Sequence, residues 1–162
     1  MSRRSVGAAG GAAAALALAT GTIAAWEGRK LDPYYDIAHV LTVCEGITKN
    51  VQNRRYTNAE CDALLKENVA EHGQPVLKIL PADAPVEVAA AHVSLAYNIG
   101  VTAYLGSSAA RFARAGDYPH ACQAIGAWNK VKLWPSGKLV VSRGLDNRRK
   151  DEMALCARGL LR

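Results

Sequence analysis

Helix signals dominate the chain from residue 57 to residue 157. The first helix has the clearest beginning, because Thr57 and Glu60 form a capping box ahead of an amphipathic segment that stops at Gly73. A Trp-Pro-Ser-Gly turn at residues 134–137 interrupts the pattern before the last helix. The pattern therefore predicts five helices, over residues 57–73, 86–98, 107–116, 118–128 and 145–157.

The region ahead of these helices has the pattern of a small sheet. Residues 37–43 are rich in β-branched and aliphatic side chains and lie between polar segments, which predicts one or two short strands. A small sheet followed by several helices is an α+β architecture. The composition, 50% apolar and 21% charged, excludes a disordered chain and an all-membrane protein. A length of 162 residues suits one domain or two small ones, and a compact core is feasible.

Residues 6–25 form a separate apolar segment, in which 14 of 20 residues are Ala or Gly and none is charged. As a helix it would reach roughly 30 Å, which is enough to cross a bilayer. Only Val6, Leu16, Leu18 and Ile23 are strongly lipophilic, so insertion would be marginal and reversible. The Arg3 and Arg4 side chains precede the segment, and the positive-inside rule then places everything after residue 25 outside the cytoplasm.

Two other interpretations of this segment stay open. The arginine pair, the apolar run and the small residues around Ala24 and Ala25 also fit a cleavable signal peptide. A soluble alanine-rich helix without a role in export is the third interpretation.

Four cysteines lie beyond the apolar segment, at Cys44, Cys61, Cys122 and Cys156. An even number in an exported chain favours disulfides. Of three possible pairings, short-range closure favours Cys44 with Cys61 and Cys122 with Cys156, and buried free thiols are the alternative. No CxxC motif occurs and the four histidines are isolated, so we expect no zinc site.

The net charge of +6 is concentrated near the C-terminus. Residues 130–162 hold nine basic and three acidic side chains, including the run Arg148, Arg149 and Lys150 in the last predicted helix. An anionic partner is implied, which could be nucleic acid, anionic lipid or a carboxylate-rich wall polymer, and a solvated helix face is the alternative. We expect the basic run to be exposed and to contact that partner.

Glu27, Asp36 and Thr42 are the candidate catalytic residues. Two carboxyl groups and a hydroxyl are what glycoside hydrolysis needs, because one carboxylic acid protonates the leaving oxygen while a carboxylate activates water. Glu27 is the better acid, since its neighbours are apolar. In one continuous strand Asp36 and Thr42 would lie ~20 Å apart, so a hairpin must join them. By spacing alone this set of residues is a weak signal, and solvated charges are the favoured interpretation.

Four segments in order resemble phage-type lysozymes, glycoside hydrolase family 24. The first, WEGRKLDPYYDIAHVLTVCEG, carries the family pattern of Glu, eight residues, Asp, five residues and Thr, at Glu27, Asp36 and Thr42. The other three segments are YTNAECDALL, VSLAYNIG and GLDNRRKDEMALC. The resemblance covers residues 26–162.

This resemblance implies a lysozyme-like domain over residues 26–162, with a small β lobe followed by a mostly helical lobe. It implies hydrolysis of the β-1,4 bond between N-acetylmuramic acid and N-acetylglucosamine in peptidoglycan. Glu27 would be the general acid, and Asp36 and Thr42 would activate and hold the water. We expect a monomer that acts on bacterial peptidoglycan, without a cofactor or metal and without nucleic acid as a partner.

Residues 1–25 resemble the signal-anchor-release segments of certain phage endolysins, which first tether the enzyme to the inner membrane and later leave the bilayer. The implied location is the periplasmic side of the host inner membrane, and then the periplasm. Cleavage after Ala25 would leave Glu27 as the second residue, where fraying would disturb its placement. We therefore expect the segment to be retained.

Two positions depart from the family pattern, since His39 stands where many members have Gly, and Ile47 stands where many have His. Tyr97 and Asn98 are candidates for the floor of a cleft, although helix packing is the more common role for such residues. Two rival functions remain: a lytic transglycosylase, which needs no water-activating Asp36, and a membrane-active or wall-binding protein without catalysis.

Overall fold

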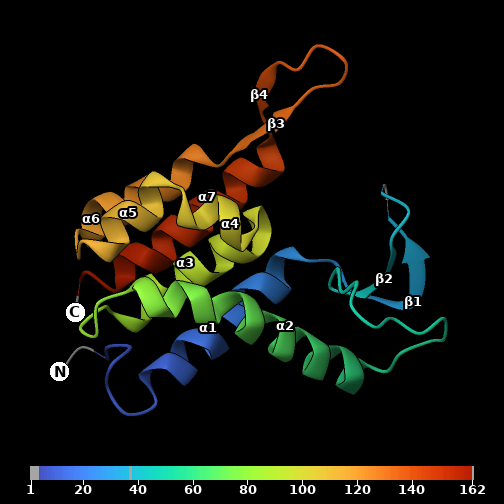
Figure 1. The fold of residues 1–162 in the computed structure, drawn as a ribbon, viewed down its shortest axis with the longest axis horizontal. Helices are drawn as coiled ribbons and strands as arrows, with labels where there is room; N and C mark the ends of the chain where they lie inside the picture. The colour runs from blue at the N-terminus through green and yellow to red at the C-terminus, as the bar shows by residue number, and fades with distance from the viewer. Residues whose placement is uncertain (1–3, 37, 162) are drawn as a thin grey trace.

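Helix α3 (Val86–Ile99) is the central element of the fold. The computed structural model describes residues 4–36 and 38–161, so Arg3, Ile37 and Arg162 lie outside the described residues. Apolar and small side chains cover every face of α3, and ten of its 14 residues are buried. Three longer helices pack against it, namely α1 (Gly11–Trp26), α2 (Asn58–Ile79) and α7 (Arg143–Arg158) (Figure 1).

Helix α1 contains most of the predicted apolar segment. It buries Gly11, Ala15, Ala19 and Ile23, which are four residues apart and therefore share the face that packs on α3. The helix begins after the segment does, because residues 4–7 pair instead with residues 82–86; Gly7 N–H, for example, donates to the Ala82 carbonyl at 2.8 Å. Within residues 4–36 and 38–161, no helix has both the length and the apolar character needed to cross a membrane.

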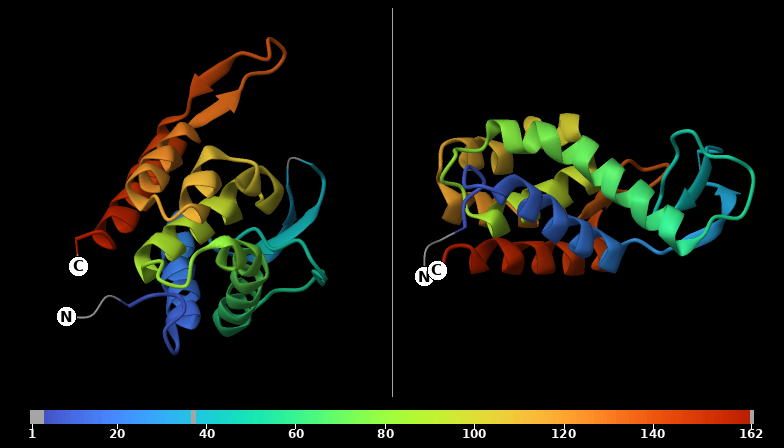
Figure 2. Two further views of the ribbon diagram at one scale, coloured as in Figure 1. Left: turned by 60° about the vertical axis from the view of Figure 1, so that its left-hand side comes forward. Right: turned by 90° about the horizontal axis from the view of Figure 1, so that it is seen from below.

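Strands β1 (Lys30–Tyr35) and β2 (Leu41–Cys44) form an antiparallel hairpin in which Tyr34 lies opposite Thr42. This lobe lies at the opposite end of the molecule from the two termini (Figure 2). The prediction of strand over residues 37–43 is right for residues 41–43, whereas residues 38–40 precede β2 and Ile37 lies outside the described residues. β1 was not predicted, since Pro33 and Asp32 weaken its strand pattern.

All five predicted helices are present, but several ends differ. α2 continues past Gly73 to Ile79, because Gly73 is a packing position where a Cβ atom would lie 2.4 Å from Leu16 Cδ2 of α1. Gly100, with φ of 90°, separates α3 from an unpredicted short helix, α4 (Val101–Leu105). The remaining helical elements are α5 (Ser108–Arg114), α6 (Tyr118–Ala124) and a 3-10 turn, η1 (Ile125–Ala127).

A second antiparallel hairpin, β3 (Lys130–Lys132) and β4 (Leu139–Val141), surrounds the predicted turn at residues 134–137. The favoured cysteine pairing is confirmed. Cys44–Cys61 joins β2 to α2, and Cys122–Cys156 joins α6 to α7. Each disulfide therefore attaches a short or peripheral element to one of the long helices.

Candidate active site

Glu27 directly follows α1 and caps its C-terminal end. Its backbone N–H donates to the carbonyl of the buried Ile23 at 2.9 Å. Its carboxylate accepts a hydrogen bond from Nη1 of Arg148 in α7 at 2.7 Å, and the Glu27 side chain is 28% exposed. The predicted general acid is therefore held from two sides, by the packing of α1 on α3 and by the ion pair to α7, while it stays open to solvent.

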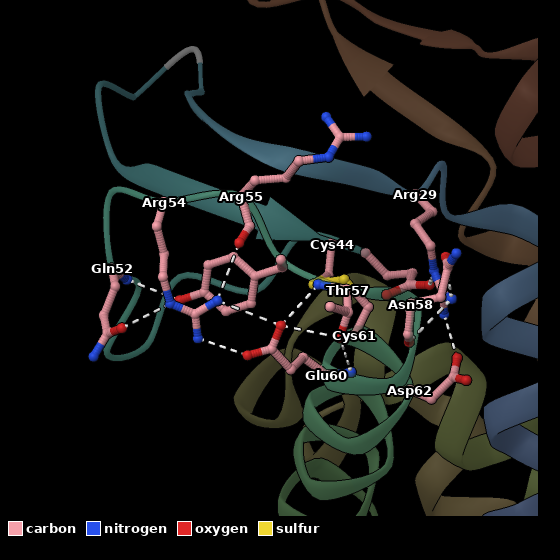
Figure 3. The surroundings of a disulfide bond; sticks show 12 residues. Arg29, Cys44, Gln52, Arg54, Arg55, Thr57, Asn58, Glu60, Cys61 and Asp62 are labelled. Atoms are coloured by element: carbon pink, nitrogen blue, oxygen red, sulfur yellow. Dashed lines mark hydrogen bonds and ion pairs between the residues drawn. A yellow bond between two sulfur atoms is a disulfide. The ribbon is translucent and has the colours of Figure 1, made fainter.

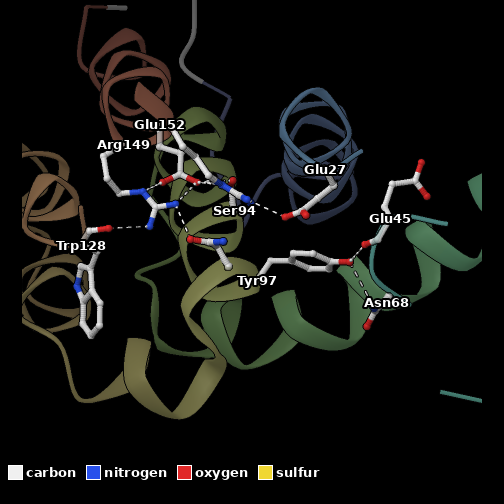
Figure 4. A network of polar contacts seen from close by, with 10 residues as sticks. Glu27, Glu45, Asn68, Ser94, Tyr97, Trp128, Arg149 and Glu152 are labelled. Atoms are coloured by element: carbon white, nitrogen blue, oxygen red, sulfur yellow. Dashed lines mark hydrogen bonds and ion pairs between the residues drawn. The ribbon is translucent and has the colours of Figure 1, made fainter. Parts of the chain in front are cut away.

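Arg148 belongs to a buried cluster of charges between α3 and α7, of which Figure 4 labels Ser94, Arg149 and Glu152. Glu152 Oε1 accepts from Ser94 Oγ at 2.7 Å and from Arg148 Nε at 3.2 Å, and Arg149 Nε lies 2.8 Å from Glu152 Oε2. Burial raises the pKa of Glu152 and lowers that of Arg149, and the attraction between the two opposes both shifts. The cluster therefore fixes the arginine that orients Glu27.

The prediction of an exposed basic run in the last helix is wrong for two of its three residues. Arg148 and Arg149 are only 5% and 1% exposed, whereas Lys150 is exposed and pairs with Asp146 at 2.7 Å. Consecutive residues on a helix point in different directions, so a basic run alone does not show which members face inward. The sequence signal for the two buried arginines is Glu152, which follows Arg148 by four residues and Arg149 by three and therefore lies near both on the helix.

The β1–β2 hairpin brings Asp36 and Thr42 together, as the predicted hairpin requires. Asp36 follows β1, and its Oδ1 accepts hydrogen bonds from the backbone N–H groups of Ala38 at 2.8 Å and Val40 at 2.9 Å. Thr42 is buried in β2, and its Oγ1 donates to the Val40 carbonyl at 2.9 Å. Across the described part of the chain, no hydrogen bond connects Glu27 with either residue, so Glu27 and the hairpin are separate parts of the candidate site.

The two departures from the family pattern have structural explanations. His39 has φ of 56° in the turn after Asp36, and this left-handed conformation is the one that favours Gly. Ile47 is 3% exposed and packs beside Tyr56 and the disulfide of Cys44 in the small core of the β lobe. Neither departure alters Asp36 or Thr42.

Tyr97 and Asn98, near the end of α3, both belong to polar networks at the site. Tyr97 points toward Glu45 and Asn68 (Figure 4), donates to the Glu45 carbonyl at 3.3 Å and accepts from Asn68 Nδ2 at 3.3 Å. Burial, assisted by the negative charge of Glu27, raises the pKa of Tyr97 to about 12. Asn98 Oδ1 accepts from Arg149 at 2.9 Å. Tyr97 and Asn98 therefore each form side-chain hydrogen bonds and do not serve in helix packing alone.

Arg29 attaches the end of α1 to both the β lobe and α2 (Figure 3). Its Nε pairs with the buried Glu45, and its Nη2 donates to Asp62 at 2.6 Å. These hydrogen bonds, first to Asp62 and then to Glu45, raise the pKa of Arg29. Sequence reasoning missed this link because the partners are 16 and 33 residues away. The link therefore connects the segment that follows Glu27 to the β lobe and to α2.

Within residues 4–36 and 38–161, one group of side chains has the spacing of a metal site, namely Cys44, Glu45 and Cys61. Its two sulfur atoms are joined in the disulfide, so neither is a thiolate ligand. His92 is buried elsewhere, in α3, with Nδ1 3.0 Å from the Tyr104 hydroxyl.

Residues 24–152 match the Phage lysozyme family. The chain belongs to this family. It is 33% identical over 144 residues to the SAR-endolysin of Pseudomonas phage phiKMV, covering 88% of each protein. It is 35% identical over 137 residues to the SAR-endolysin of Enterobacteria phage P21, covering 82% of this chain and 78% of that protein. The active form of P1 phage endolysin Lyz is a structural neighbour, with a TM-score of 0.76, 25% identity and coverage of 88% and 84%.

Family membership confirms three predictions from the sequence. The fold is α+β and lysozyme-like, the enzyme is a muramidase-type glycoside hydrolase, and the resemblance to phage endolysins is correct.

Proposed function

We propose that this phage lysozyme hydrolyses the β-1,4 bond between N-acetylmuramic acid and N-acetylglucosamine in host peptidoglycan. Relatives that match most of the chain are named endolysins, which supports a role in lysis. The observation that best supports the site is the placement of Glu27, which is held by Arg148 at 2.7 Å and is still partly exposed. The hairpin that carries Asp36 and Thr42 supplies the second carboxylate.

In the proposed reaction Glu27 gives its proton to the glycosidic oxygen as the bond to the anomeric carbon breaks. Asp36 accepts a proton from a water molecule that Thr42 helps to hold. The oxygen of that water attacks the anomeric carbon from the opposite face and inverts its configuration. The backbone amides on Asp36 Oδ1 orient this carboxylate before the substrate binds.

A lytic transglycosylase is the nearest alternative chemistry. It also needs an acid such as Glu27, but its product forms without attack by water, so it has no use for Asp36 and Thr42. Mass spectrometry of the released muropeptides separates the two reactions, because hydrolysis leaves reducing ends and transglycosylation leaves anhydro ends.

Carboxamide variants test the catalytic residues. We expect Glu27→Gln and Asp36→Asn each to lower turnover of purified wall sacculi by about 10² to 10⁴-fold, because each loses a proton donor or acceptor but keeps its shape. Glu67→Gln and Asp151→Asn are matched controls at exposed positions and should retain activity. Near-normal turnover by both catalytic variants, or persistent lysis through a non-catalytic route, would contradict the assignment.

We further propose that residues 6–25 first anchor the enzyme in the inner membrane, and that residues 11–25 of this segment later pack on α3 within α1. The absence of charge in this segment and the SAR-endolysin relatives support the proposal. The two states exclude one another, because a helix surrounded by lipid cannot also pack on α3. In the anchored state Glu27 would lose the support of Ile23 and its fixed position beside Arg148, so the tethered enzyme should be inactive.

The exposed face of α1 offers a direct test of this control. Changing Ala12, Ala17 and Gly21 to Leu would add roughly 1 to 2 kcal/mol of insertion free energy without touching the buried face. We expect more full-length protein in the membrane fraction and delayed lysis of the host. The same three positions changed to Gln form the control and should shift the protein out of the membrane. Full lysis by a membrane-retained leucine variant would contradict the mechanism, while the catalytic assignment would stand.

A further inference from the structure

The β3–β4 hairpin extends away from the helical body (Figures 1 and 2). Most of its apolar side chains are exposed, with Trp134 at 94%, Leu139 at 62% and Val141 at 57%. The tip is an ordered turn, because Gly137 N–H donates to the Leu133 carbonyl at 2.7 Å and Leu133 N–H donates to the Lys138 carbonyl at 2.8 Å. A group of exposed apolar side chains on one projecting element marks an interaction surface.

The hairpin is also strongly basic. Residues 130–143 contain Lys130, Lys132, Lys138 and Arg143, and no acidic residue. The strand register puts Lys130 opposite Val141 and Lys132 opposite Leu139, so lysines and apolar side chains share one face. Within the described ranges 4–36 and 38–161, none of the three lysines takes part in an ion pair. Their charge is therefore available to an external anion.

This combination of side chains selects among anionic partners. A glycan is a poor partner, because aliphatic side chains cannot form hydrogen bonds with its hydroxyl groups. A second copy of this hairpin is also a poor partner, because the two sets of lysines would repel each other. A bilayer surface accepts all three types, because indole rings settle at the headgroup level, aliphatic side chains enter below it, and lysines contact lipid phosphates. We propose that the β3–β4 hairpin is a docking arm for the surface of an anionic phospholipid bilayer, with Trp134 entering the interfacial layer.

The proposed arm is independent of the anchor and of the catalytic residues. It lies outside residues 6–25 and is exposed while α1 is packed on α3. In the described part of the chain, no hydrogen bond or ion pair links its strands to Glu27, Asp36 or Thr42. The arm would therefore hold the released enzyme at the membrane surface without altering catalysis.

Vesicle binding by the full-length protein tests the charges. Cosedimentation would use vesicles of phosphatidylglycerol with phosphatidylcholine, and pure phosphatidylcholine vesicles for comparison. We expect Lys130, Lys132 and Lys138 changed together to Gln to weaken binding to the anionic vesicles by about 100-fold at low salt. The control changes the exposed Lys49, Lys66 and Lys78 to Gln, which removes the same charge from another surface. An equal loss in the control would overturn the proposal, because net charge alone would explain it.

Trp134 provides the local readout. In vesicles with brominated acyl chains, Trp134→Phe should keep binding but lose most of the quenching of tryptophan fluorescence, because only Trp26 and Trp128 remain. Quenching that persists in Trp134→Phe would overturn the proposal and indicate insertion through α1. The proposal would also be overturned if the lysine variant lost binding to purified sacculi but kept its binding to vesicles. That result would indicate an arm that binds the cell wall. Sacculus hydrolysis measured in parallel reports on the catalytic assignment separately, and it should be unchanged in both hairpin variants.

Discussion

Helices α1 and α3 are both apolar and rich in alanine, but they are buried in different ways. Ten of the 14 residues of α3 are buried, whereas α1 buries four of its 16, each four positions from the next. α3 therefore has neighbours on all sides, whereas α1 fully buries only one stripe of mostly small side chains and packs Leu16 and Leu18 partly beside it. The difference shows how a helix without charges can cover the core while it buries little apolar area of its own. Such a helix can leave the protein at a lower cost than α3 could.

Truncation of the largest side chain in the α1 stripe should have the greatest effect. Ile23 is fully buried, so Ile23→Ala should lower the free energy of unfolding by about 2 to 5 kcal/mol. Activity per folded molecule should also fall, by up to about 100-fold, because the last turn of α1 positions Glu27. Urea unfolding and sacculus turnover measure the two effects.

The matching change in α3 is Val88→Ala, at a fully buried position near the N-terminal end of α3. It should lower stability while activity per folded molecule stays normal. If Val88→Ala were as harmful to turnover as Ile23→Ala, Glu27 would depend on the whole core and not on α1 in particular.

A second difference is that α3 contains a buried titratable group and α1 contains none. Burial lowers the pKa of His92 to about 4, whereas an unfolded histidine titrates near 6.5. Between these values the unfolded chain binds a proton that the folded chain does not, so stability falls as the pH falls through this window. From pH 7 to pH 4.5 we expect the His92 contribution to cost on the order of 2 kcal/mol.

Urea unfolding of wild type and His92→Asn at the two pH values measures this contribution. The variant should lose less stability on acidification than wild type, and His120→Asn, at an exposed position, should behave as wild type does. The same pH dependence in wild type and His92→Asn would assign the acid sensitivity to other groups.

The smallest expected effect on stability comes from an Ala→Leu substitution made once in α3 and once in α1. Ala90 is fully buried in α3, so Ala90→Leu should overpack the core and destabilise the protein by about 1 to 3 kcal/mol. Ala12 lies on the exposed side of α1, where Ala12→Leu should change stability by less than about 0.5 kcal/mol. Thermal unfolding of the two variants gives the comparison, and equal shifts would mean that the outer face of α1 is also packed.

Local signals predicted much of the fold. The capping box at Thr57 forms as expected, with the Thr57 side chain accepting from the Glu60 N–H. Strand β1 was missed because Pro33 interrupts its strand pattern. The β3–β4 hairpin was missed because its short, lysine-rich strands lack a clear alternation of apolar and polar residues. Short strands depend on their partners, and a partner is a tertiary property.

The candidate site divides in the same way. Glu27, Asp36 and Thr42 were named from their residue types and from the resemblance of their segment to the phage-lysozyme pattern, and their roles stay predictions. Arg148 was named only as part of a basic surface, although its partner Glu27 lies 121 residues away. Glu152, four residues later, was a local sign that Arg148 has a partner, but Lys150 likewise has Asp146 four residues before it, so spacing alone does not show which of the two basic residues is buried.

By itself the sequence determined the family, the order and type of most helices, the favoured cysteine pairing and the residues proposed for catalysis. Each of these depends on residue identity and short-range spacing. Only the tertiary structure decided which arginines face inward, how residues 4–7 pair with residues 82–86, and that Arg29 links α1 to the β lobe. These features arise from contacts between residues far apart in the chain, where burial and the need to pair charges outweigh local preference.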